Sequence, residues 1–150
     1  MTMSASKIRT ELLGQHGEIR KRIEEVRAAM DKLRKGESAR DLLRTTLAHL
    51  ADAVRRHNHR EEELLKDVIP NVDAWGPARA EVMVEEHGKE HQEIYAALVE
   101  AGATPDGDVA AGIVAKLLER MNEHMAVEEK VLLGEDVLHD DLVPREYFGG

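Results

Sequence analysis

The sequence predicts an all-α protein, an up-down-up-down antiparallel four-helix bundle with a short C-terminal tail. Aromatic residues make up only 3% of the chain, whereas β-sheets are enriched in aromatic and β-branched side chains. Apolar residues recur at steps of three and four along four long segments, which is the period of one helix face. Short connections between such segments give antiparallel neighbours. We therefore expect the bundle over residues 1–134 and the tail over residues 135–150.

Capping and breaking residues set the ends of the first two segments. The first helix is expected over about residues 6–35, because Gly36 can adopt the left-handed conformation that ends many helices. The second helix is expected over about 38–69, with Ser38 as its N-cap. It should stop before Pro70, which cannot continue a helix.

The third and fourth segments are bounded in the same way. Pro77 suits the first position of a helix that we expect over 77–101, since its missing N–H is not needed there. The sequence from Thr104 to Gly107 reads as a turn and a helix start. We expect the fourth helix to run from this turn to about residue 133, before Gly134.

Each apolar stripe is interrupted by histidine, or by histidine and glutamate, where an aliphatic side chain is expected. The interrupting residues are His16, His57, Glu61, His87, His91, His124 and Glu128. At about 1.5 Å per residue they all lie roughly 10–20 Å from one end of the bundle, because neighbouring helices run in opposite directions. Burying so many polar groups is costly without mutual compensation, and a metal accepts neutral imidazoles and carboxylates as ligands. The pattern therefore predicts a metal site.

Spacing within the helices supports this interpretation. Three pairs, 57/61, 87/91 and 124/128, have the i,i+4 separation that places both side chains on one side of a helix. Other polar residues leave the stripes and are expected to face solvent or to support the ligands; they are His49, His59, Glu62, Glu63, Glu129 and His139. The helix boundaries are inferred, so Glu128 and Glu129 remain alternatives, as do Glu61 and Glu62. The stripe favours the first of each pair.

The order and spacing of these residues resemble the hemerythrin family, specifically the hemerythrin-like HHE cation-binding domains, over about residues 6–133. The resemblance implies two non-heme iron ions that are bridged by carboxylates and by an oxo or hydroxo group. It also implies roles: His87, His91 and His124 would hold one iron, His16 and His57 the other, which keeps an open position, and Glu61 and Glu128 would bridge them. Oxygen-carrying hemerythrins place the last carboxylate five residues after its histidine, where this chain has Glu129.

Two other metal sites fit the sequence less well. A ferritin-like di-iron site requires Glu-x-x-His on each of two helices, and this spacing does not occur in the chain. A catalytic zinc site takes three protein ligands and a water. The chain offers seven candidate ligands, two of which are carboxylates, and this number favours two metals. Iron itself is implied by the resemblance, because nitrogen and oxygen ligands also suit manganese and zinc.

The expected function is the binding of dioxygen or a related small ligand for carriage, storage or sensing, and we favour a binding protein over an enzyme. The aliphatic residues flanking the stripe histidines would keep such a pocket dry; they are Leu12, Ile19, Val54, Val84, Ile94 and Met121. A di-iron enzyme that turns over peroxide or nitric oxide is the alternative, with Tyr95 as a possible proton donor. An iron- or oxygen-responsive regulatory module is the third hypothesis.

Composition limits the partners and the location. A formal net charge of -9 disfavours nucleic acid as a partner, and no apolar run reaches the roughly 18 residues of a membrane span. The chain has no cysteine and no recognisable signal peptide, so we expect a cytoplasmic protein. The tail carries apolar residues that either fray or fold back over the bundle end near Trp75, where they would limit access of water to the irons.

Overall fold

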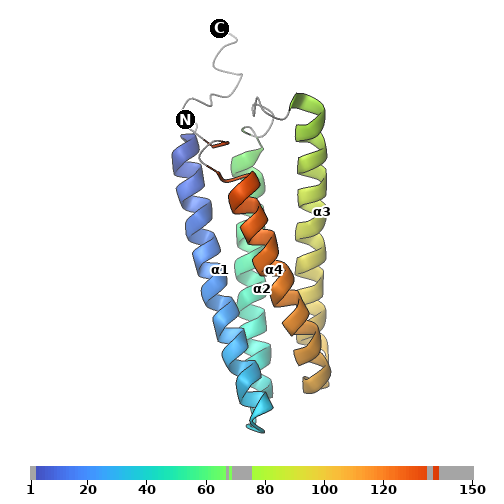
Figure 1. Ribbon diagram of the computed structural model, residues 1–150. Helices are drawn as coiled ribbons and strands as arrows, with labels where there is room; N and C mark the ends of the chain where they lie inside the picture. Colours follow the sequence, from blue (N-terminus) through green and yellow to red (C-terminus); the bar gives the residue numbers. More distant parts are fainter. Residues whose placement is uncertain (1–2, 67, 69–75, 135–136, 139–150) are drawn as a thin grey trace.

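The computed structural model describes residues 3–66, 68, 76–134 and 137–138, and this part of the chain forms four helices and no strand. The helices are α1 (Ala5–Arg34), α2 (Arg40–Leu65), α3 (Gly76–Ala103) and α4 (Gly107–Val131). Figure 1 shows them side by side along one long axis, and α1–α2, α2–α3, α3–α4 and α1–α4 are in contact. The predicted up-down-up-down bundle is confirmed.

Both ends of α1 are closed by hydrogen bonds that the sequence makes possible. The side chain of Ser4 accepts a hydrogen bond from the backbone N–H of Lys7 at the first turn. At the other end Gly36 has a φ of +80°, which L-residues with a side chain rarely adopt. This conformation lets the N–H of Glu37 donate to the carbonyl of Lys32 at 3.0 Å, so the predicted stop at Gly36 is confirmed.

Both ends of α2 differ from the prediction. The N-cap is Ala39, which makes no side-chain cap hydrogen bond, so the predicted role of Ser38 is wrong. Ser38 lies one residue too early to reach the free N–H groups, and Asp41 in the first turn provides the favourable negative charge instead. The helix ends at Leu65 with Lys66 as its C-cap. A proline ring in a helix clashes with the backbone carbonyl of the residue four positions earlier. For Pro70 that residue is Lys66, the C-cap of α2.

The turn before α4 is built by one aspartate. The carboxylate of Asp106 accepts hydrogen bonds from the backbone N–H groups of Asp108 at 2.9 Å and Val109 at 3.2 Å. These are two of the donors that a helix leaves unpaired at its start. The predicted helix start after Thr104 is therefore confirmed.

The apolar core that the described residues form is divided into two clusters, with the polar residues between them. The larger cluster fills the part of the bundle where α1 and α3 finish and α2 and α4 begin. Its members nearest the histidines include Ile19, Val54, Ile94 and Met121. The smaller cluster lies at the end where α1 begins and α4 finishes, and contains Ala5, Ile8, Leu12, Leu65, Val68, Leu132, Leu133 and Leu138. The stripe histidines lie between these two apolar layers.

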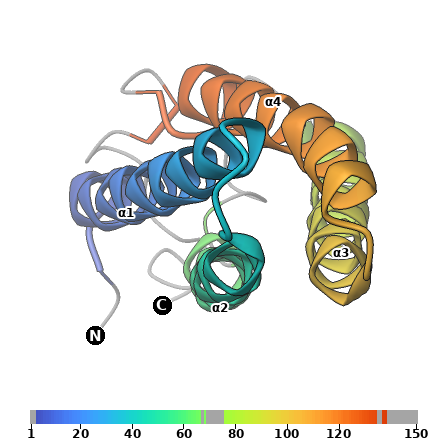
Figure 2. The ribbon, with the colours of Figure 1, turned by 90° about the horizontal axis from the view of Figure 1, so that it is seen from below.

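Helix α4 crosses the bundle obliquely. Figures 1 and 2 both show its first turns beside α3 and its last turns closer to α1. The separation of α3 and α4 therefore grows toward the end of the bundle that holds the polar residues.

Candidate metal centre

All four helices contribute to one polar cluster inside the bundle. The contributors are His16 from α1, His57 and Glu61 from α2, His87 and His91 from α3, and His124 and Glu128 from α4. Their side chains are between 0 and 16% exposed. The structure thus brings together the seven residues that the stripes singled out.

The potential ligand atoms form two groups that share one carboxylate. Glu128 lies with His87, His91 and His124 in one group, and with His16, His57 and Glu61 in the other. Within each group the atoms lie within 4.8 Å of one another. Separations of this size suit side chains that converge on a single ion, so the geometry offers two adjacent cation positions.

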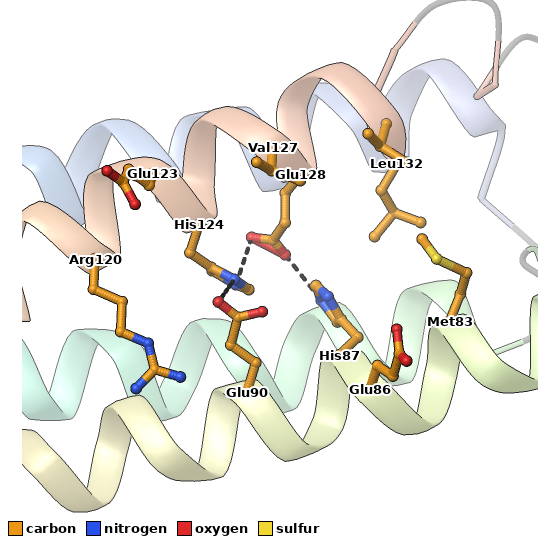
Figure 3. A pocket seen from close by; sticks show the side chains of 11 residues that line it. Met83, Glu86, His87, Glu90, Arg120, Glu123, His124, Val127, Glu128 and Leu132 are labelled. Carbon is orange, nitrogen blue, oxygen red and sulfur yellow. Dashed lines mark ion pairs between the residues drawn. The ribbon is translucent and has the colours of Figure 1, made fainter.

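The carboxylate of Glu128 spans the two groups. Its Oε1 lies 3.2 Å from Nε2 of His16 and 3.2 Å from Nε2 of His124. Its Oε2 lies 2.9 Å from Nε2 of His87, and Figure 3 shows this contact beside the one to His124. An anion in this position can contact both cation positions at once.

Glu61 lies between the groups in a similar way. Its Oε2 is 2.8 Å from Nε2 of His57, and its Oε1 contacts Nε2 of His87 and lies 3.6 Å from Nε2 of His91. Its neighbour Glu62 is 57% exposed, with an oxygen 3.6 Å from the outer nitrogen of His91. Glu61 therefore occupies the interior position, as the stripe indicated.

Glu128 and Glu129 occupy different sides of α4. Glu128 is 4% exposed and Glu129 is 26% exposed. Glu129 accepts from Nδ1 of His16 at 2.9 Å and from Nη2 of Arg20 at 2.8 Å. Successive helical residues differ by about 100°, so only one of the two can point inward. The structure places Glu128 there, while Glu129 supports a histidine from outside.

Within the described residues, the interior atoms of this cluster lack hydrogen-bond partners. They include Nε2 of His16, His57, His91 and His124, Oε2 of Glu61 and both carboxylate oxygens of Glu128. The atoms approach one another closely, but not along hydrogen-bonding directions. A buried polar atom without a partner costs about 1–3 kcal/mol, and a bound cation would engage these lone pairs. The donor set therefore fits a metal with nitrogen and oxygen ligands.

Outer hydrogen bonds orient the histidine rings. Nδ1 of His57 donates to the side-chain oxygen of Gln15 at 2.7 Å, and Nδ1 of His124 lies 3.1 Å from Oε1 of Glu90. Together with the contact between His16 and Glu129, these contacts favour the tautomer that carries its proton on the outer nitrogen, which leaves Nε2 free to bind a metal. Glu129 was among the residues expected to face solvent or to support the ligands, and it supports His16. Gln15 and Glu90 were not predicted in this role, because each supports a histidine on another helix.

The histidines and carboxylates of the cluster shift one another's pKa values. Burial lowers the pKa of His87, but contacts with Glu128 and Glu61 outweigh it and raise that pKa to about 10. Burial also lowers the pKa values of His16 and His124, but their carboxylate neighbours outweigh burial and raise both values. Burial raises the pKa of Glu128, yet its histidine partners hold it well below its usual range. The site thus attracts positive charge.

A small apolar cavity adjoins the cluster. Its volume is about 20 Å³, and Ile19, Val54, Ile94, Met121 and Met125 line it beside histidine side chains. This is room for about one small molecule. Four of the six aliphatic residues that were expected to line a dry pocket therefore do so.

The other two aliphatic residues lie elsewhere. Leu12 is fully buried, but it packs in the smaller apolar cluster on the opposite side of the histidines. Val84 is 49% exposed, so its expected place in the lining is wrong. It belongs to the early part of α3 and does not line the cavity.

Residues outside the stripes behave as expected where they are described. His59 is 80% exposed and His49 is also exposed. Tyr95 borders a separate groove with Arg44 and Arg55, and this groove is not lined by the cluster histidines. His139 and Trp75 lie outside the described residues.

Two residues of the predicted tail contact the bundle end. Leu138 is 2% exposed within the smaller apolar cluster, and Val137 packs against that cluster. The folding back of the tail is thus confirmed for these two side chains. The rest of the segment lies outside the described residues.

Comparisons with known proteins bear on this cluster. Residues 7–135 match the family described as Hemerythrin HHE cation binding domain. Neither curated proteins nor solved structures gave a match. A separate search of the described residues for a helix that could span a bilayer found none.

Proposed function

Since the chain belongs to the hemerythrin HHE cation-binding domain family, we propose that its buried cluster holds two iron ions and binds dioxygen or a similar diatomic molecule for carriage, storage or sensing. The observation that supports this most strongly is the set of inward-facing ligand atoms that have no hydrogen-bond partner in the described part of the chain. Cation binding is the family property, and the identity of the metal and of the small ligand is the proposal. A cytoplasmic location stays a prediction, which cell fractionation tests.

The two groups suggest how the ligands divide. His87, His91 and His124 would hold one iron, and His16 and His57 the other, with Glu61 and Glu128 as bridges. The position with two histidines has fewer protein ligands and would be the open one. Bound iron would supply the redox chemistry that dioxygen binding requires.

The chain's own residues provide the environment for a neutral ligand. The cavity beside His57, His91 and His124 is small, and its other walls are mostly apolar. A neutral diatomic molecule loses little hydration in such a space, whereas an anion or a larger substrate would lose more. The aliphatic and thioether side chains of the cavity wall carry no proton to donate to a bound ligand, which favours reversible binding over turnover.

The catalytic alternative, turnover of peroxide or nitric oxide, requires a nearby proton donor. Tyr95 was the candidate, and it borders a groove with Arg44 and Arg55 on the outer side of α2 and α3. This position does not serve the cluster. The structure therefore offers this alternative less support than the sequence did.

Metal analysis and visible spectroscopy of the purified protein test the proposal. We expect two irons per chain and an absorption change with dioxygen that reverses when the gas is removed. His87→Ala should lose metal, whereas His59→Ala should keep two ions, because the side chain of His59 is 80% exposed. Equal loss from both variants would refute the proposed centre. Irreversible bleaching with consumption of peroxide would favour the enzyme.

A further inference from the structure

A cleft separates α3 from α4 beside the cluster. Its volume is about 440 Å³, and its inner wall includes His87, His124 and Glu128. Figure 3 shows these three side chains facing the space between the two helices. The cleft thus joins the solvent to the interior ligands, and it lies where α4 leans away from α3.

The outer part of the cleft is acidic. Glu86 and Glu90 of α3 and Glu123 of α4 line it, and Glu86 and Glu123 are exposed. Arg120 is the basic residue of the lining, and its Nη2 donates to Glu93 at 2.8 Å. A neighbouring carboxylate therefore offsets this positive charge, and the potential of the cleft favours cations.

The inner end of the cleft is built to receive a cation. Glu128 is 4% exposed, and both its oxygens lack hydrogen-bond partners among the described residues. Nε2 of His124 is unpaired in the same way, and its side chain is 10% exposed. Glu90 contacts the outer nitrogen of His124, so a carboxylate of the lining lies directly beside a ligand.

Ion pairs cross two other sides of the cluster. Arg20 of α1 bonds Glu129 of α4 beside His16. Arg60 of α2 donates to Glu11 of α1 at 2.7 Å, one turn from His57. Each pair bridges two helices over the site. The pair of Arg120 and Glu93 likewise joins α4 to α3, so the feature that distinguishes the cleft is its open acidic lining.

We propose that the α3–α4 cleft is the route by which divalent cations reach the centre, with Glu86 and Glu123 attracting the hydrated ion and Glu90 leading it to His124 and Glu128. The inference rests on the proposed function, because it requires that the cluster bind metal. It assigns to exposed glutamates a role in the rate of metal uptake. The final affinity would depend on the interior ligands.

Stopped-flow uptake of cobalt(II) by the full metal-free chain tests the route. The variant Glu86→Gln/Glu123→Gln removes two charges from the cleft. The control Glu85→Gln/Glu119→Gln removes two charges from exposed positions on the same helices that do not line it. At about 10 mM ionic strength we expect the uptake rate of the cleft variant to fall roughly five- to tenfold, and that of the control less than twofold. At 1 M salt the difference should nearly vanish.

A second measurement needs no metal-free protein. Transfer of cobalt from the loaded chain to excess chelator should slow by the same factor in the cleft variant, because a route shared by uptake and release changes both rates and leaves the affinity unchanged. A second pair of variants, Val127→Arg in the cleft wall and Val109→Arg outside it, places a positive charge on an exposed position of α4 in each case. Only the first should slow both rates.

The outcomes separate the route from the centre. Two cobalt ions per chain, with equal rates in cleft and control variants, would overturn the route and leave the centre standing. Wild-type protein that binds no cobalt or iron would refute the centre and the route together.

Discussion

The carboxylate of Glu129 lies 2.9 Å from Nδ1 of His16, on the side of the ring that faces away from the polar cluster. The preceding residue, Glu128, lies 3.2 Å from Nε2 of the same ring, on the inner side. Arg20 holds Glu129 with a further hydrogen bond of 2.8 Å. One imidazole is therefore oriented by two successive carboxylates, of which the inner one would contact metal and the outer one fixes the tautomer.

This arrangement predicts unequal effects of two neighbouring substitutions. Glu128→Gln removes the charge shared by both groups, and we expect it to lose at least one of two metals per chain. Glu129→Gln keeps the inner ligands and should weaken metal affinity by about 10- to 100-fold. Metal titration against a competing chelator measures both. Full retention of two metals by Glu128→Gln, with loss in Glu129→Gln, would reverse the assignment.

The stability of the metal-free protein should decline at alkaline pH. Glu128 and Glu61 outweigh burial and raise the pKa of His87 from 6.5 to about 10. A raised pKa in the folded state stabilises the fold fully below pH 6.5, and this stabilisation is lost as the pH rises toward 10. We expect the Tm of metal-free protein to fall from pH 7 to pH 10.

The metal-loaded protein serves as the control, because a ligating imidazole is already neutral and carries no titrating proton on its ligating nitrogen. Its Tm should change less over the same range. Metal binding to the free protein at pH 7 should also release protons, which an indicator dye in weak buffer detects. A steeper alkaline decline for the loaded protein, or binding without proton release, would contradict the predicted protonation of His87.

The small cavity can be filled without altering a ligand. Val54→Ile adds one carbon to the cavity wall, and Val114→Ile adds the same group to a fully buried core position that does not line the cavity. We expect Val54→Ile to weaken binding of dioxygen by about tenfold or more, since one misplaced methylene costs roughly 1–3 kcal/mol. Spectroscopic titration with dioxygen at equal iron content measures this. Equal effects of both variants would exclude the cavity as the binding place.

The contact between the tail and the bundle has a measurable energy. Leu138→Ala should lower the free energy of unfolding by about 2–5 kcal/mol, because Leu138 is 2% exposed in an apolar cluster. Val99→Ala, at a half-exposed position on α3, should change it little. Urea denaturation compares the two variants. Unchanged stability of Leu138→Ala would show that the contact contributes nothing.

The sequence predicted the bundle and the composition of the cluster because both depend on periodicity within single helices. A stripe of the 3.6-residue period identifies which side chains face inward, so Glu61 and Glu128 could be distinguished from Glu62 and Glu129. The glycine at Gly36 and the aspartate at Asp106 set helix ends through local hydrogen bonds. Such bonds join residues that are close in the chain, so they can be predicted from the local sequence.

Features that depend on two helices were not predictable in the same way. The exposure of Val84 depends on which segments pack against that part of α3, and no pattern within α3 encodes this. Gln15 and Glu90 stand next to stripe histidines in the chain, yet each supports a histidine of a neighbouring helix. The cleft between α3 and α4 likewise arises from the angle between two helices.

The division of the apolar core by the polar layer affects how the bundle unfolds. Among the described residues, eight buried apolar side chains pack at one end and a larger cluster packs beyond the histidines, and the helices and the charged layer connect the two. We expect the small end of the metal-free protein to open as a separate foldon while the large end stays intact. Ligands from all four helices on two ions would join the ends into a single cooperative unit. Metal binding would then determine how much of the bundle unfolds in one cooperative step, in addition to determining its overall stability.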